Sequence, residues 1–248
     1  MIDLHCHILP GIDDGARDLQ DALAMARQAQ ADGIGIVCAT PHIRHDHDVR
    51  IGELEGRCRE LNAALARAGI RTRVDPAGEV AETIVEHLDP DELATVALGR
   101  GGWILLEPAP GPLGDSLAAA AESLARRGFR SLVAHPERHL AADTHERLAA
   151  LVGAGALVQA TAALLLEEGP DQGMLELARR GLIHVLGSDA HSAAAGRPAR
   201  LSEALARLGE VEPLRAHLDW VREEAPRAIL AGRAVRPPYP ALAGPRAL

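Results

Sequence analysis

Residues 1–16 read MIDLHCHILPGIDDGA, with two histidines one residue apart and two aspartates in the stretch that follows. If residues 3–7 form a β-strand, Asp3, His5 and His7 share one face, because successive side chains of a strand point to opposite faces. Two imidazoles aimed at one point suit a divalent cation. The alternative on this stretch alone is a pair of histidines near a strand end whose hydrogen bonds are satisfied by their neighbours.

The composition is that of a globular protein with an aliphatic core. The 248 residues are 47% hydrophobic, 25% charged and only 2% aromatic, which suits one large α/β domain or two small ones. The formal net charge of −9 argues against nucleic acids and anionic membranes as partners. The sequence has no apolar run of membrane-spanning length and no basic segment leading into a signal peptide. We therefore expect no membrane insertion and a cytoplasmic location.

Two residue types restrict the chemistry further. The three cysteines, Cys6, Cys38 and Cys58, are an odd and widely spaced set that does not resemble a disulfide framework. The sequence contains no lysine. This excludes Schiff-base chemistry and the lysine of a phosphate-binding P-loop.

Short apolar runs alternate with amphipathic segments along the chain, which predicts a parallel sheet with right-handed crossovers. Besides the first strand, we expect strands at residues 34–40, 72–74, a stretch closing at Glu79, 103–107, 131–135, 157–160 and 182–186. We expect helices at residues 18–32, 53–68, 115–127, 201–208 and 211–230. About seven such units favour a barrel over an open sheet. We expect a single domain over residues 1–235 and an extended or loose proline-rich tail over residues 236–248.

Polar side chains gather where the predicted strands end, which is the face that carries the active site in β/α barrels. They are His5, His7, Asp13, Asp14, His42, Glu79, Glu107, His135, Asp189 and His191. A single histidine at a strand end is usually structural. Six strand ends that all supply His, Asp or Glu instead predict one functional cluster.

Even without Asp13, the five histidines and four carboxylates of this set exceed the four to six ligands that saturate one metal ion. We expect two or three metals bridged by carboxylates, a type of site that clamps phosphate and generates hydroxide from bound water. Arg138 would supply a planar bidentate donor to phosphate oxygens. Arg197 would do the same, or would be a surface charge beyond a loop. Mixed imidazole and carboxylate ligation does not by itself select one metal.

The segment Cys38 to Arg44 reads CATPHIR and matches the Cys-x5-Arg spacing of cysteine-dependent tyrosine phosphatases. That chemistry needs a thiolate held by a loop of free backbone N–H groups. Cys38 lies in an apolar run predicted as a strand, and Pro41 has no N–H. We therefore expect Cys38 to be a core thiol, and we read Cys6 in the same way.

Other titratable residues are expected outside the ligand set. His184 alternates with apolar neighbours, which favours a place in the core or beside a ligand, and Asp3 and Asp13 are expected to orient the ligands. The loop with His45 and His47 is expected to be solvated, with a place at the border of a substrate site as the alternative. The remaining predicted surface histidines are His87, His145 and His217.

Six blocks of the sequence resemble the polymerase-and-histidinol-phosphatase (PHP) superfamily: DLHCHILPGIDDGA, ATPH, GE, LLE, LVAHPER and GSDAH. The resemblance runs from residue 1 to about residue 197 and is closest to the manganese-dependent bacterial protein-tyrosine phosphatases of capsular and exopolysaccharide synthesis. It implies a distorted (β/α)7 TIM-like barrel, a trinuclear metal site and phosphatase activity. It also implies a phosphotyrosine protein as substrate, namely a bacterial tyrosine autokinase.

Carried onto this sequence, the resemblance implies three divalent ions, manganese by analogy and iron or zinc as alternatives. The implied ligand sets are His5, His7, Glu79 and Asp189 for one metal, Glu79, Glu107 and His135 for a second, and Asp14, His42 and His191 for the third. Arg138 and Arg197 match arginines that bind phosphate in the related phosphatases. Ile43, His139 and the segment AGEVAET depart from the related sequences, which puts the substrate rim in question rather than the ligands.

Two other functions stay open on the sequence. A histidinol-phosphate phosphatase, or another small-molecule phosphatase, would use the same scaffold and metals. A metal-binding interaction domain without enzymatic activity would be expected to have lost ligands, whereas every ligand position of this chain is filled. An enzyme is therefore the favoured prediction.

Overall fold

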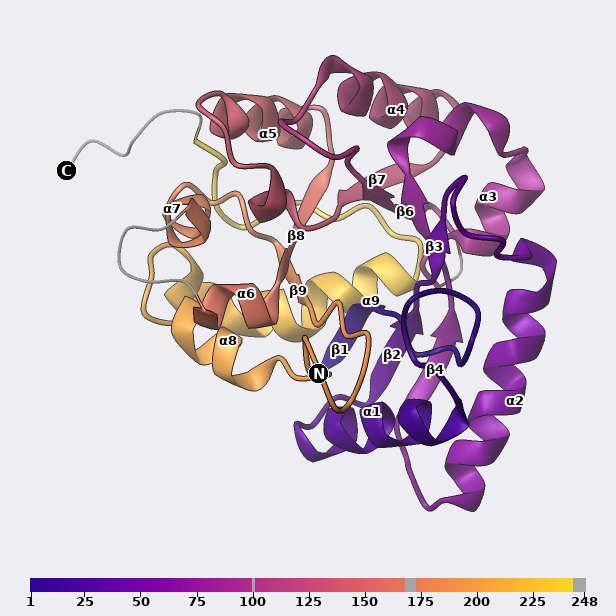
Figure 1. Cartoon of the computed structure of the whole chain (residues 1–248). Coiled ribbons are helices and arrows are strands. Elements are labelled where there is room, and N and C mark those ends of the chain that lie inside the picture. Colours follow the sequence, from indigo (N-terminus) through magenta and orange to yellow (C-terminus); the bar gives the residue numbers. More distant parts are fainter. Residues whose placement is uncertain (100, 168–172, 243–248) are drawn as a thin grey trace.

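The computed structural model describes residues 1–99, 101–167 and 173–242 (Figure 1). Its strand pairings are parallel and fall into two sheets, of order β1-β2-β4 and β3-β5-β6-β7-β8-β9. The strands are β1 (Ile2–Cys6), β2 (Ile36–Ala39), β3 (His42–Ile43), β4 (Arg73–Pro76), β5 (Glu79–Ala81), β6 (Trp103–Glu107), β7 (Arg130–Val133), β8 (Leu157–Thr161) and β9 (Val185–Gly187).

Helices follow most of the strands, and nearly all of them surround the strands in Figure 1; the last helix instead lies across the middle of the view. They are α1 (Leu19–Ala31), α2 (Leu54–Arg67), α3 (Pro90–Val96), α4 (Asp115–Arg126), α5 (Thr144–Gly153), α6 (Ala162–Glu167), α7 (Gly173–Arg179), α8 (Ser202–Leu208) and α9 (Ala225–Leu230). Short 3-10 turns occur at Ile51–Glu53, Glu82–His87, Pro136–His139 and Leu214–His217. In the part of the chain that the structure describes, we find no helix long and apolar enough to cross a bilayer.

Hydrogen bonds join the two sheets into one curled surface. The pairing of β2 with β4 continues into that of β3 with β5, because Ala77 N–H donates to the Ala39 oxygen (2.9 Å) and Glu79 N–H donates to the Pro41 oxygen (3.0 Å). At the other end, Cys6 of β1 forms a bridge to Ala190, directly beyond β9. The α/β prediction is therefore confirmed, and the parallel strands curl so that the first lies beside the last.

Local signals in the sequence explain where α1 begins and ends. The Asp18 carboxylate accepts a hydrogen bond from the N–H of Asp21 (2.9 Å) and so satisfies one of the free donors of the first turn. Leu23 and Ala26 are buried on one side of the helix. Gly33, at φ +82°, takes the left-handed conformation that lets the chain leave the helix. The predicted helix at residues 18–32 is thus confirmed.

The predicted helix at residues 211–230 is wrong as a single element. A turn at residues 211–213 leads into the 3-10 turn Leu214–His217, and a π-helical segment, Trp220–Glu224, precedes α9. Pro226 explains the π-helical segment, because it lacks the N–H that an α-helix needs at this position. Glu79 also differs from the prediction: it opens β5 instead of closing a strand.

The described part of the C-terminal tail is extended, as expected, but it is packed rather than loose. Tyr239 is only 6% exposed, and its hydroxyl donates to the backbone oxygen of Ile183 (2.7 Å). Its ring stacks on that of His184, with centroids 6.1 Å apart. Leu242 N–H donates to the Arg180 oxygen (2.9 Å), which ties the tail to the segment before β9.

Candidate metal centre

Glu79 lies at the centre of the polar cluster and is completely buried. Its Oε1 lies 2.7 Å from His135 Nε2 and 3.3 Å from His5 Nε2. Its Oε2 lies 2.9 Å from His42 Nδ1 and 3.4 Å from His7 Nε2. One carboxylate therefore contacts four imidazoles from three separate segments of the chain, which is the arrangement expected of a bridging ligand.

Two predicted ligands, His135 and Asp189, follow strand ends in a left-handed backbone conformation. Their φ angles are 31° and 50°, and among the described residues they are the only non-glycine residues with positive φ. This conformation costs about 1–2 kcal/mol for a residue with a Cβ and is typical of functional sites. At Asp189 the turn places Oδ1 3.5 Å from His5 Nε2 and 3.6 Å from His7 Nε2.

The outer side of the cluster is formed by Asp14, His42, His191 and Glu107. Asp14 Oδ1 lies 3.5 Å from Nε2 of both His42 and His191, and the Asp14 side chain is 58% exposed. Glu107 Oε2 lies 3.7 Å from His42 Nδ1. The cluster is therefore buried around Glu79 and opens to solvent at Asp14.

The donor chemistry of these residues fits divalent cations. Ligand atoms lie within 4.8 Å of one another in four groups: His5, His7 and Glu79; His5, His135 and Asp189; His42, Glu79 and Glu107; and His7, Asp14, His42 and His191. Although His42 Nδ1 and Glu79 Oε2 are close, neither makes a hydrogen bond, and neither does Glu107 Oε2. Buried nitrogens and carboxylate oxygens without hydrogen-bond partners are the groups that a metal ion satisfies.

Asp13 and Asp3 both accept hydrogen bonds from predicted ligands. Asp13 Oδ2 accepts from His7 Nδ1 (2.8 Å) and from the N–H of His42 (3.1 Å). Burial alone would raise the pKa of Asp13, but the hydrogen bond from His7 and its charge lower this pKa to about 2. Asp3 Oδ1 accepts from the N–H groups of His5 (3.1 Å) and Ser188 (3.0 Å), and burial raises the pKa of Asp3 to about 6.

The histidines of the cluster differ in charge. Burial opposes protonation of His5, but the carboxylates of Glu79 and Asp189 outweigh it and raise the pKa of His5 to about 9. His42 behaves in the same way: burial lowers its pKa, but neighbouring carboxylates raise it to about 10. Burial and the charge of His7 instead lower the pKa of His191 to about 4. Neighbouring carboxylates thus favour the protonated forms of His5 and His42.

Arg138 and Arg197 both reach Asp189. Arg138 Nη2 donates to Asp189 Oδ2, from the 3-10 turn Pro136–His139. Arg197 Nη2 donates to Asp189 Oδ1 (3.2 Å), Arg197 Nε donates to the Asp189 backbone oxygen (2.6 Å), and His191 Nδ1 lies 2.9 Å from Nη2. Their side chains are 35% and 25% exposed. Arg197 therefore lies at the cluster and not on an unrelated surface.

Cys38 is a core thiol, as predicted. It is completely buried in β2, and burial raises the pKa of its thiol far above the ordinary value, so it does not form the thiolate that the cysteine mechanism requires. Cys6 and Cys58 are also buried and free. Arg44, the last residue of the Cys-x5-Arg match, pairs instead with Asp46 and with Glu107 (3.2 Å).

The loop that carries His45 and His47 borders the cluster. The ring of His47 lies 4.9 Å from that of His42, and the ring of His45 lies 5.6 Å from that of His87. These contacts support the alternative that placed the loop at the border of a substrate site. His184 is fully buried away from the ligands, and its Nδ1 accepts from the N–H of Val158 (3.0 Å).

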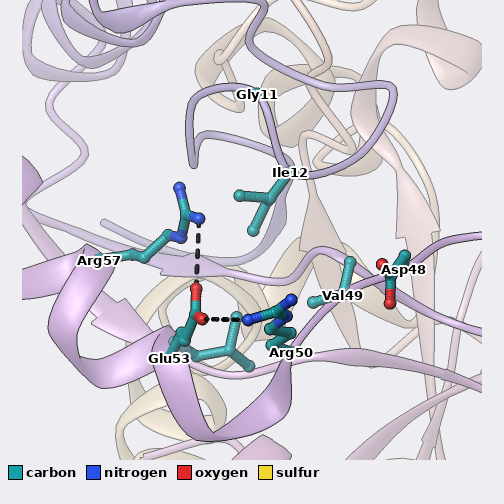
Figure 2. A pocket seen from close by; sticks show the side chains of 8 residues that line it. Gly11, Ile12, Asp48, Val49, Arg50, Glu53 and Arg57 are labelled. Atoms are coloured by element: carbon teal, nitrogen blue, oxygen red, sulfur yellow. Dashed lines mark hydrogen bonds and ion pairs between the residues drawn. The ribbon is translucent and has the colours of Figure 1, made fainter.

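A polar pocket of about 280 Å³ is formed by the loops that also carry Asp14 and His42 (Figure 2). Arg50 and Arg57 both pair with Glu53, at 3.4 and 3.2 Å. The other lining residues are Gly11, Ile12, Asp48, Val49 and Leu54. Two arginines and two carboxylates balance in charge, so the pocket does not favour an anion over a cation.

Sequence reasoning missed two polar residues of the centre, Arg44 and Gln159. Gln159 lies in β8 and is completely buried beside His5. In the sequence, Gln159 could be noticed only as a lone amide within the apolar run LVQAT. Arg44 could be noticed only by its position two residues after His42. Neither has a spacing that points to metal chemistry.

Comparison with known proteins identifies relatives. Residues 1–211 match the family described as "Capsular polysaccharide synthesis, CpsB/CapC". The tyrosine-protein phosphatase YwqE of Bacillus subtilis is 34% identical over 203 residues, which cover 77% of this chain and 78% of YwqE. CapC of Staphylococcus aureus is 27% identical over 199 residues, 77% of each protein.

The fold agrees with this relationship. A crystal structure from a study of YwqE and of CpsB from Streptococcus pneumoniae, described as unique metal-dependent tyrosine phosphatases, superposes with a TM-score of 0.79 at 28% identity. The match covers 98% of this chain and 100% of the other. By its sequence over most of its length and by its fold, the chain belongs to the CpsB/CapC family of capsular polysaccharide synthesis proteins.

Proposed function

We propose that this protein is a metal-dependent protein-tyrosine phosphatase. The observation that carries the proposal is the convergence of histidines and carboxylates on the buried carboxylate of Glu79, in a chain whose family includes tyrosine phosphatases. The arrangement leaves three candidate ligand atoms without hydrogen bonds and places two arginines at its edge. A non-enzymatic domain would not be expected to combine a cluster of candidate metal ligands with two arginines at its edge.

The proposed centre would hold three divalent ions. Manganese is the preferred candidate, and iron or zinc are the alternatives. The residues that would hold them are His5, His7, Asp14, His42, Glu79, Glu107, His135, Asp189 and His191. Bound metals would neutralise the carboxylates, polarise phosphoryl oxygens and lower the pKa of a water so that it can act as nucleophile. We count β2 with β3, and β4 with β5, as single bent strands, so that the fold is a distorted (β/α)7 barrel over residues 1–235, with residues 236–248 as its tail.

Arg138 and Arg197 would bind the non-bridging oxygens of the phosphate. A guanidinium offers two parallel N–H donors, which match two oxygens of a phosphate group. Both arginines pair with Asp189, so their donors are aimed at the cluster. The tyrosine phenolate is a better leaving group than an alkoxide, which reduces the need for a separate general acid.

The substrate that we propose is a phosphotyrosine protein, specifically a bacterial tyrosine autokinase of capsule or exopolysaccharide synthesis, acted on in the cytoplasm. Support comes from the family, which is defined by capsular polysaccharide synthesis, and from the tyrosine phosphatase YwqE. The net charge of −9 disfavours nucleic acid as a partner.

The test is a comparison of substrates. The Mn²⁺-loaded protein should hydrolyse a phosphotyrosine peptide with a higher kcat/KM than histidinol phosphate, and a Glu79→Gln variant should be inactive on both. A clear preference for histidinol phosphate would assign the protein to small-molecule phosphatases. No hydrolysis of either by metal-loaded protein would contradict an enzymatic function.

A further inference from the structure

Gln159 of β8 connects two residues of the candidate metal centre without being a metal ligand of the expected kind. It is completely buried. Its Oε1 lies 2.9 Å from His5 Nδ1 and 3.4 Å from the backbone nitrogen of His135. One amide oxygen thus reaches a ligand from β1 and a ligand from the turn after β7.

The contact with His5 determines which ring nitrogen carries a proton. An amide oxygen only accepts hydrogen bonds, so Nδ1 of His5 must be the donor. In the neutral ring, the form that binds a metal, Nε2 then presents a lone pair. This atom faces the cluster, 3.3 Å from Glu79 Oε1 and 3.5 Å from Asp189 Oδ1. Partners that hold the second N–H of a metal-binding histidine fix its tautomer and its ring orientation.

The contact with His135 supports a strained turn. His135 has φ 31° and ψ 53°, a conformation that residues with a Cβ rarely adopt. Its N–H points to Gln159 Oε1, and its Nε2 lies 2.7 Å from Glu79 Oε1. Gln159 Oε1 therefore accepts hydrogen bonds both from the ring of His5 and from the backbone N–H of His135.

The neighbouring strand leaves room for this amide. Gly187 of β9 has no side chain, and a Cβ there would lie 2.9 Å from Gln159 Nε2 and 2.7 Å from the Cβ of His5. Both distances are shorter than real Cβ contacts permit. The position of Gly187 in the GSDAH block therefore requires glycine, because a larger residue would collide with His5 and Gln159.

We propose that Gln159 is a positioning residue of the metal centre, which holds His5 as the tautomer with a proton on Nδ1 and a free Nε2 toward the metals. The inference rests on the proposed metal centre but not on the identity of the substrate. It predicts that the hydrogen-bond acceptor, and not the volume of the side chain, is what the centre requires at this position.

The experiment compares Gln159→Met, which keeps the length of the side chain without an acceptor, with Gln159→Glu, which restores the acceptor. We expect Gln159→Met to bind Zn²⁺ and Mn²⁺ roughly 10–100-fold more weakly in competition titrations, and Gln159→Glu to bind within a few-fold of wild type. In the Zn²⁺-saturated protein labelled with ¹⁵N-histidine, the slowly exchanging Nδ1–H of His5 should be present in wild type and Gln159→Glu and lost in Gln159→Met.

Asn62→Leu is the matched control, because the Asn62 amide hydrogen-bonds the backbone of Val74 in β4, at 2.7 and 2.9 Å, and belongs to none of the candidate metal groups of the described residues. It should lose stability without losing metal affinity. Wild-type affinity together with a retained Nδ1–H in Gln159→Met would overturn the proposal. If Gln159→Met does not fold, a more than tenfold loss of affinity in Gln159→Glu would overturn it. A protein that binds metals as expected but does not hydrolyse phosphotyrosine would contradict the proposed function and leave this inference intact.

Discussion

Arg138 tests how the centre would bind phosphate. Replacement by lysine keeps the positive charge beside Asp189 but removes the two-pronged donor. We expect Arg138→Lys to lower kcat/KM on a phosphotyrosine peptide roughly 10–1000-fold, about 1.4–4 kcal/mol of transition-state stabilisation. Metal content, measured by elemental analysis, should stay unchanged.

The control for this change is Arg147→Lys, because Arg147 pairs with Asp143 and Asp115 on the surface. This variant should keep the kinetics of wild type. Wild-type kinetics in Arg138→Lys would show that Arg138 only braces the turn Pro136–His139.

His184 provides a test of stability against pH. Burial lowers its pKa from 6.5 to about 3, so the unfolded chain takes up this proton before the folded protein does. The contribution to stability is present in full above pH 6.5 and is lost as the pH falls toward 3. The loss of folding stability between pH 7 and pH 5 amounts to about 2 kcal/mol.

We therefore expect the free energy of unfolding of His184→Asn to fall less than that of wild type between pH 7 and pH 5. Asparagine keeps an acceptor for the N–H of Val158 but does not titrate. Urea unfolding of both proteins in excess chelator measures the difference, since the metal ligands then titrate equally in both. Parallel stability profiles would contradict the low pKa of His184.

At the residue scale, the cluster was predictable because only a few types of side chain commonly bind metal ions. Histidines and carboxylates after successive strands form a pattern that a sequence reveals, and the structure brings all nine predicted ligands together. Gln159 was not predictable because a single buried amide has no partner until β1 and β8 are placed together. The contacts of Arg197 depend on the turn at Asp189 in the same way.

At the scale of elements, the loop after β1 depends on Gly15. A Cβ at this position would lie 2.2 Å from the His7 backbone oxygen and 2.4 Å from the His7 Cβ, so the loop would have to move. We expect Gly15→Ala to weaken Mn²⁺ binding at least tenfold and to lower the thermal midpoint, because Asp13 and His7 would separate. Isothermal titration and thermal unfolding measure the two effects.

Gly153→Ala is the matched control, since a Cβ at this end of α5 meets open space. It should leave metal binding unchanged and stabilise the protein by about 0.4–1 kcal/mol. Equal metal affinity in Gly15→Ala and wild type would show that the loop tolerates the displacement.

Elements with strong local signals were predicted well, and elements shaped by tertiary contacts were not. Apolar runs such as residues 103–107 form strands because both faces of a parallel sheet are covered. Residues 211–230 have helical spacing, but Pro226 breaks the hydrogen-bond ladder and a π-helical segment results. The short strands β3 and β5 meet because the paired backbones of β2 and β4 continue past Pro41 and Gly78, a contact that spacing does not encode.

At the scale of the molecule, the barrel-like curl could be anticipated from repeated β–α units, but the particular contacts that join its first and last strands could not. The bridge between Cys6 and Ala190 joins segments from opposite ends of the chain. The packing of Tyr239 on Ile183 and His184 likewise depends on distant segments. Local patterns predict which elements form, whereas long-range pairing decides which ends of the chain meet.

The whole fold closes around carboxylates that cations would balance, so metal removal should affect stability as well as activity. A ligand that binds only the folded state stabilises it by about 2.7 kcal/mol at a free concentration one hundred times its Kd. We expect excess chelator to abolish phosphatase activity and to lower the free energy of unfolding by an amount of this order, and added Mn²⁺ to restore both. A Glu79→Gln variant should show no comparable gain from Mn²⁺, because it lacks the central carboxylate. Full activity in excess chelator, with no metal detected by elemental analysis, would refute a metal-dependent mechanism.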